Sequence, residues 1–141
     1  MDVNRAYNLY IMIVIHLVTI VINALFIIHI IKNAKKNIVF KKFIVLQSIT
    51  MLWILSKVIK AVSPTVTIRW IAVIIQYISV AFLGYAFIQF AYVFFYNRPI
   101  KKTVNGALMS YPICVFLIVI TNPLHQLFFT SFTLTRLKFG P

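Results

Sequence analysis

Three polar side chains fall on one face of the first apolar segment of the chain. His16, Thr19 and Asn23 are spaced by three and then four residues, which places them on the same side of an α-helix. Such a stripe could line a ligand pocket or a proton path. It could equally form hydrogen bonds with neighbouring helices and fix their packing, which is a common role for neutral polar groups in membrane helices. We favour the packing role.

A second group of candidate residues combines one aromatic side chain with two amines. Trp53, Lys57 and Lys60 are spaced by four and then three residues and therefore share a helix face. Either lysine could attract an anion, or both could snorkel, with their stems in hydrocarbon and their ammonium groups among the headgroups. We favour snorkelling, because both lysines lie near the helix end. Asn122 and His125 follow a later apolar segment and are expected near the same membrane face. These five residues form the candidate site for an unknown small ligand, with His125 more simply explained as an interfacial polar group.

The residue types that catalysis requires are scarce. Asp2 is the single acid among 141 residues, whereas acid–base catalysis by carboxylates needs a positioned Asp or Glu. Cys114 is the only cysteine, so the chain can form no internal disulfide and no cysteine-based metal site. The histidines fall at different expected depths, and the sequence contains no phosphate-binding loop and no serine-elbow motif. We therefore expect no enzyme activity, no metal and no cofactor in these residues.

The apolar content decides the class of protein. The chain is 62% hydrophobic with a mean hydropathy of +0.99, which is more apolar surface than a small soluble domain can bury. Its formal net charge of +13 would suggest nucleic acid in a soluble protein. Here the bases gather between apolar runs, a pattern that membrane topology explains better. We expect a multi-pass protein of the cell membrane, in contact with the lipid bilayer and with no nucleic-acid partner.

Four segments are long or apolar enough to span a membrane, which takes roughly 20 mainly apolar residues. They cover about residues 7–31, 43–62, 70–96 and 104–120. Helix stops are predicted at Ser63-Pro64 and at Asn97-Arg98-Pro99, and Asn105-Gly106 is interpreted as the turn into the fourth segment. The fourth segment is predicted to end at the Thr121-Asn122-Pro123 break, so that residues 121–141 form an interfacial outer loop.

The basic residues between these segments indicate an orientation. Both the connection between the first two segments and the connection between the last two are rich in lysine and arginine, whereas the connection between the middle two is not. The positive-inside rule then places the two basic connections in the cytoplasm and the N-terminus outside. The predicted fold is an all-α, polytopic membrane bundle of four transmembrane helices. The basic residues concerned are Lys32, Lys35, Lys36, Lys41, Lys42, Arg98, Lys101 and Lys102.

Three stretches resemble a known family: the RWIAVIIQY opening of the third segment, the basic NRPIKK loop, and LMSYPICVFLIVITNPLHQLFF. They are similar to the N-terminal seven-transmembrane region of bacterial sensor histidine kinases. In that family the fourth helix commonly carries a proline and ends in Thr-Asn, then a His-Leu/Phe-Phe stretch, as Pro112 and the run from Thr121 to Phe129 do here. Trp53 and Gln76 also look like family positions. The family's second helix often has an acid near its outer end, where this chain has two lysines.

The resemblance implies that residues 1–141 are a partial sensor region with about the first four of seven helices. The other three helices and a cytoplasmic output domain would then lie beyond Pro141, and so would any kinase or cyclase activity. The chain would be the membrane-embedded input module of a two-component signalling protein. Its partners would be those missing parts, a small ligand and, in a homodimer, a second copy. The alternative is a small transporter or channel subunit, although proton-coupled transporters of this size generally need a membrane-embedded carboxylate.

Overall fold

The structure of the chain is a computed structural model that describes residues 3–33 and 37–125. It contains four α-helices: α1 (Val3–Asn33), α2 (Ile38–Val62), α3 (Val66–Tyr96) and α4 (Lys102–His125). Each helix contains a stretch that is long and apolar enough to cross a membrane. The predicted all-helical class, with four candidate membrane spans, is therefore confirmed.

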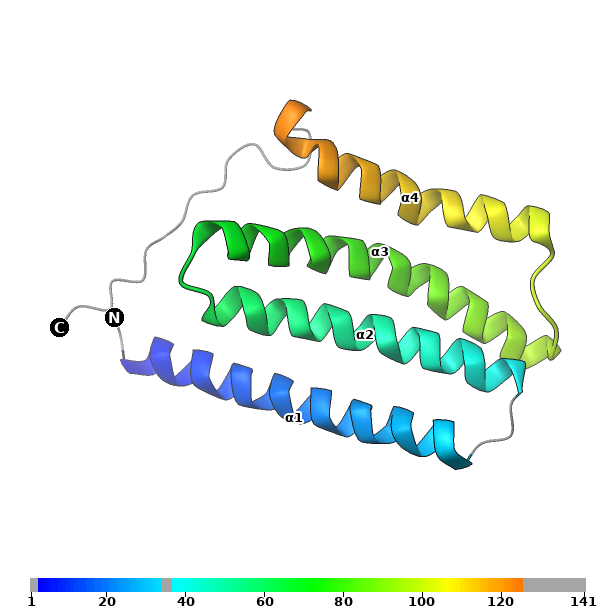
Figure 1. The fold of residues 1–141 in the computed structure, drawn as a ribbon, viewed down its shortest axis with the longest axis horizontal. Helices are drawn as coiled ribbons and strands as arrows, with labels where there is room; N and C mark the ends of the chain where they lie inside the picture. The colour runs from blue at the N-terminus through cyan, green and yellow to red at the C-terminus, as the bar shows by residue number, and fades with distance from the viewer. Residues whose placement is uncertain (1–2, 34–36, 126–141) are drawn as a thin grey trace.

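The four helices lie side by side in chain order as an open row (Figure 1). Within the described residues, α2 packs against α1 and, more extensively, α3, while α4 packs against α3 alone. Consecutive helices run antiparallel because short connections join them. Along the helix axes the bundle has two ends. We call the end that holds the α1–α2 and α3–α4 connections the basic end. The opposite end, with the α2–α3 connection and the last turn of α4, is the far end.

The helices extend further than the apolar pattern predicts. α2 begins at Ile38 rather than near residue 43, because Asn37 caps it and its side-chain oxygen accepts a hydrogen bond from the Val39 N–H at 3.4 Å. Lys41 and Lys42 therefore lie in the helix and not in a loop. The 25 residues of α2 span about 38 Å, against roughly 30 Å of hydrocarbon, so the polar helix ends reach into the headgroup region. α3 begins at Val66, before residue 70, because it too is longer than the hydrocarbon layer and its first turn reaches into the headgroup region.

Two of the predicted helix stops are confirmed. α2 ends immediately before Ser63-Pro64, and the Ser63 N–H donates to a carbonyl of the last helical turn at 3.0 Å. α3 ends immediately before Asn97, which adopts the left-handed conformation with φ 49° and ψ 27°. Asparagine is one of the few residues that adopts this conformation readily, so Asn97 serves as the C-cap.

Two other predicted boundaries are wrong. Asn105-Gly106 is not a turn before the fourth helix, because both residues lie inside α4, which begins at Lys102. α4 also continues through Thr121-Asn122-Pro123 to His125 instead of ending at residue 120. Val119 and Asn122 are 0% and 3% exposed, so tertiary packing of these turns overrides the local stop signal. Residues 126–141 of the expected outer loop lie outside the described residues.

The helix contacts use small residues and aromatic rings. α3 buries Ala72, Ala81 and Ala86, which lets the neighbouring helices approach closely. In the basic half, Phe43 of α2 lies 5.8 Å from Phe26 of α1 and 5.4 Å from a phenylalanine of α3, measured between ring centres. Most large apolar side chains of α1 remain exposed. A lipid environment removes the cost of that exposure, which water would impose.

Candidate functional site

The far half of α2 brings Trp53 and Lys57 into contact. The ammonium nitrogen of Lys57 lies 3.7 Å from the centre of the Trp53 ring, which is a cation–π interaction. Because Asp2 is the only acid in the sequence, residues 3–33 and 37–125 contain no carboxylate that could pair with this lysine. The Trp53 ring thus orients a positive charge that an anion could still neutralise.

Two polar atoms on α2 and α3 are buried without a hydrogen-bond partner: the Nε1 of Trp53 and the Oε1 of Gln76. Trp53 lies nine residues before Val62, the last residue of α2, and Gln76 lies ten residues after Val66, the first residue of α3. Both are therefore about 15 Å from the α2–α3 connection along antiparallel, packed helices. One atom is a donor and the other an acceptor. A buried polar group without a partner costs about 1–3 kcal/mol, so each of these two atoms calls for an explanation.

Depth distinguishes the residues of this site from one another. If α2 is centred on the hydrocarbon layer, about 4 Å of each helix end projects beyond it. Lys60 then lies at the boundary and is exposed, whereas Lys57 lies about 4 Å inside and is half-buried. Trp53 lies about 10 Å inside, well below the interface where aromatic belts form. Lys60 therefore fits the anchoring role, and Trp53 does not.

Arg69 adds a further cation at the far end. Its Nε donates to the backbone carbonyl of Ser63 at 2.6 Å, which ties the first turn of α3 to the α2–α3 connection. Bonds of this kind, in which the donor is charged, are stronger than those between neutral groups. The sequence offered only the spacing of six residues across Ser63-Pro64 as a signal for this contact.

The other two members of the predicted site are placed differently. Asn122 is buried in the last turns of α4, which packs against α3. In the row of helices α3 separates α4 from α2, so Asn122 lies on the opposite flank of α3 from Trp53 (Figure 1). His125 is the last residue of α4, and its side chain lies outside the described part of the structure. The structure therefore brings together Trp53 and Lys57, and it places Gln76 at a similar depth on the neighbouring helix α3.

The predicted polar stripe of α1 forms hydrogen bonds along its own helix. The side chains of His16, Thr19 and Asn23 bond the backbone carbonyls of residues 12, 15 and 19, at 2.6, 2.8 and 3.0 Å. All three side chains are half-buried. In each of these side chains, one polar atom is therefore satisfied within its own helix.

A polar cluster between α3 and α4 escaped the sequence analysis. The side-chain oxygen of Asn105 accepts hydrogen bonds from the Tyr85 hydroxyl, at 2.8 Å, and from the side-chain amide of Gln89. Gln89 is 4% exposed. We call these three residues the Asn105 cluster. A signal was available, because Tyr85 and Gln89 lie one turn apart on a very apolar helix and Asn105 opens the next helix.

Comparison with known families identifies the chain. The family model of the N-terminal 7TM region of histidine kinase matches residues 11–141. No curated protein and no solved structure matches the chain. The matched residues include nearly all of the four helices, and these helices imply a lipid bilayer around the protein. The chain is therefore a membrane protein that belongs to the family of N-terminal 7TM regions of histidine kinases.

Proposed function

We propose that the chain is the membrane-embedded input module of a bacterial signal-transduction protein of the sensor histidine kinase type, with the catalytic output domain elsewhere in that protein. Membership of the family and the four candidate spans support this function. The observation that carries the proposal is the group formed by Trp53, Lys57 and Gln76. A positive charge and an unpaired donor share the far half of α2, and an unpaired acceptor lies at a similar depth on the packed helix α3.

The residues of this group suggest the class of ligand. The ammonium group of Lys57 has no carboxylate partner among the described residues, which favours a small anion. Trp53 would donate its indole N–H to that anion, and Gln76 would accept a hydrogen bond from a hydroxyl, an amine or a water of the ligand. Lys60, Asn122 and His125 would border the site.

A signal could leave this site through a small shift between α2 and α3. A ligand changes such an equilibrium only if it binds the two helix arrangements with different affinities. Pairing the buried Nε1 of Trp53 or Oε1 of Gln76 in one arrangement alone would supply about 1–3 kcal/mol, which is roughly a 5- to 150-fold shift. That range is sufficient to switch an output.

The proposed orientation places the far end outside the cell and the basic end in the cytoplasm. Six lysine and arginine residues with described positions lie at the basic end, whereas four lie at the far end. By the positive-inside rule, this bias supports a cytoplasmic position for the basic end. The six are Lys32, Lys41, Lys42, Arg98, Lys101 and Lys102, and the four are Arg5, Lys57, Lys60 and Arg69.

The fluorescence of Trp53 provides a direct binding test. The chain has only two tryptophans, so a Trp70→Phe variant leaves Trp53 as the sole indole. We expect acetate, phosphate or sulfate to shift or quench its emission in a saturable manner. The response should disappear in Lys57→Gln and persist in the matched control Lys60→Gln. If none of the three anions gives a saturable response, the proposed anion site is contradicted.

The competing function is a transporter or channel subunit, and two observations distinguish it from signalling. Ion or solute flux across liposomes that contain only this chain would favour transport. The reading frame after Pro141 is the simpler observation. We expect it to continue into further membrane helices and a kinase or cyclase domain, and a stop codon there would contradict the input-module proposal.

A further inference from the structure

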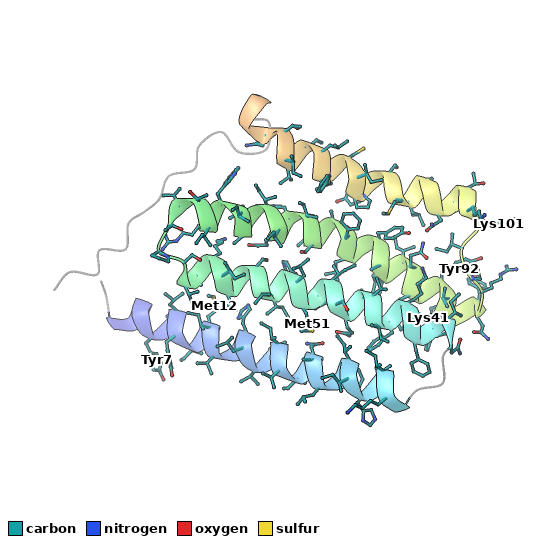
Figure 2. All side chains as sticks on the ribbon, viewed as in Figure 1. Tyr7, Met12, Lys41, Met51, Tyr92 and Lys101 are labelled. Carbon is teal, nitrogen blue, oxygen red and sulfur yellow. The ribbon has the colours of Figure 1, made fainter. Side chains whose placement is uncertain are left out.

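We infer that the basic end of the helix row is a binding surface for anionic phospholipid headgroups. This surface is distinct from the proposed ligand site, which lies at the far end. Six cationic side chains with described positions lie at this end, and all but Lys42 are exposed. Figure 2 shows Lys41 in α2 and Lys101 directly before α4 at this end. Because the sequence holds no acid besides Asp2, no carboxylate in the described residues can neutralise them.

The positions of the lysines make an external counter-charge favourable. Lys41 and Lys42 lie near the start of α2, and Lys101 and Lys102 lie at the start of α4. The first turn of each of these helices contains no acidic residue. The start of a helix carries a partial positive charge that favours anions and disfavours cations. Both lysine pairs therefore add to a positive potential that nothing described in the chain offsets.

The aromatic residues beside these charges match the layered chemistry of a phospholipid. Phe94, Phe95 and Tyr96 form the exposed end of α3, with exposed fractions of 60%, 79% and 61%. Arg98 lies two residues after Tyr96, and its guanidinium carbon lies 5.9 Å from the centre of the Tyr96 ring. Aromatic rings at the acyl–headgroup boundary and cations just beyond it follow the same order as the acyl chains, glycerol and phosphate of a lipid.

The distribution of the cations favours lipid over a free anion. The charges come from the ends of all four helices, which lie side by side in a row, and not from one pocket (Figure 1). A row of charges at one membrane face fits several headgroups in a plane, whereas a free phosphate could contact only one or two of them. Clusters of four to eight basic residues next to membrane helices are a recognised signature of binding to anionic lipids.

The test compares variants that neutralise two basic residues at one end of the helices or at the other. The full chain is placed in nanodiscs, and electron spin resonance measures the association of spin-labelled phosphatidylglycerol relative to spin-labelled phosphatidylcholine. The variants at the basic end are Lys41→Gln/Lys42→Gln and Lys101→Gln/Lys102→Gln. The far-end control with the same loss of charge is Arg5→Gln/Lys60→Gln, which leaves Lys57 of the proposed ligand site in place. The charge-preserving variant Lys101→Arg/Lys102→Arg separates loss of charge from loss of folding.

We expect the wild-type chain to prefer phosphatidylglycerol by on the order of fivefold, which is what one lysine contributes near an anionic surface. The preference should decrease in either glutamine pair at the basic end, fall toward unity when both pairs are combined, and persist in the far-end control and in the arginine variant. It should also weaken at about 1 M salt, where the Debye length is about 3 Å. Three results would each overturn the proposal: no preference in the wild type, an equal loss in the control, or full displacement by free glycerol phosphate at low salt.

Discussion

Replacing Asn105 by alanine should loosen the contact between α3 and α4. The oxygen of Asn105 accepts two hydrogen bonds, from Tyr85 and from the buried Gln89, so the variant leaves two donors without an acceptor. A hydrogen bond between membrane helices contributes about 0.6 kcal/mol on average and up to about 1.7 kcal/mol. Two such bonds give an expected loss of about 1–3 kcal/mol in the free energy of unfolding. Burial of Gln89 favours the upper part of that range.

The assay is reversible unfolding of the chain in mixed micelles, followed by circular dichroism. Ser110→Ala is the matched control, because the Ser110 hydroxyl donates to a carbonyl of α4 itself at 2.7 Å and is exposed. It should change the free energy of unfolding by less than about 0.5 kcal/mol. Asn105→Ala combined with Gln89→Leu should lose less than the sum of the two single variants, because one deletion removes the donor that the other leaves unpaired. Equal losses for Asn105→Ala and Ser110→Ala would refute the argument.

Three further predictions concern the orientation and the backbone. In a Cys114→Ser background, a membrane-impermeant thiol reagent added outside the cell should label Thr65→Cys and not Arg98→Cys, and the reverse pattern would contradict the proposed orientation. Gly84→Ala should leave the free energy of unfolding unchanged or raise it by up to about 1 kcal/mol, because no atom lies within 4 Å of the added Cβ; a loss above that size in the same unfolding assay would reveal a helix packed there. Asn97→Val should lower the free energy of unfolding by about 1–2 kcal/mol, because a β-branched residue resists the left-handed conformation, whereas Asn97→Gly should not lower it.

Apolar patterning was sufficient to predict the number and order of the helices, but not their ends. The apolar pattern predicts Lys41 and Lys42 in a loop because they are charged, whereas Asn37 caps a helix that begins before them. The Thr121-Asn122-Pro123 break predicts the end of the fourth helix, yet the helix continues through the packed turn around Asn122. In each case an interaction outside the local apolar pattern, a cap or a tertiary contact, determines the boundary.

The candidate site was predictable only where its residues share one helix. Trp53 and Lys57 lie one turn apart, so their contact follows from helical spacing. Gln76 lies at a similar depth on the neighbouring helix because α2 and α3 are antiparallel and packed, which a spacing within one segment cannot indicate. The Asn105 cluster was missed for a related reason: Asn105-Gly106 carries a strong local turn signal, and only the packing of α4 on α3 shows that Asn105 is an acceptor inside a helix.

The central claim is that the far half of the α2–α3 pair controls the output of a signalling protein. The most direct test is the output of the full-length protein in native membranes, measured as autophosphorylation for the proposed kinase, with and without the anion that perturbs Trp53 fluorescence. We predict that Lys57→Gln abolishes the response to the anion, that Gln76→Leu changes the basal output, and that Lys60→Gln alters neither. If all three variants respond like the wild type at equal membrane abundance, the far half of α2–α3 is not the input site.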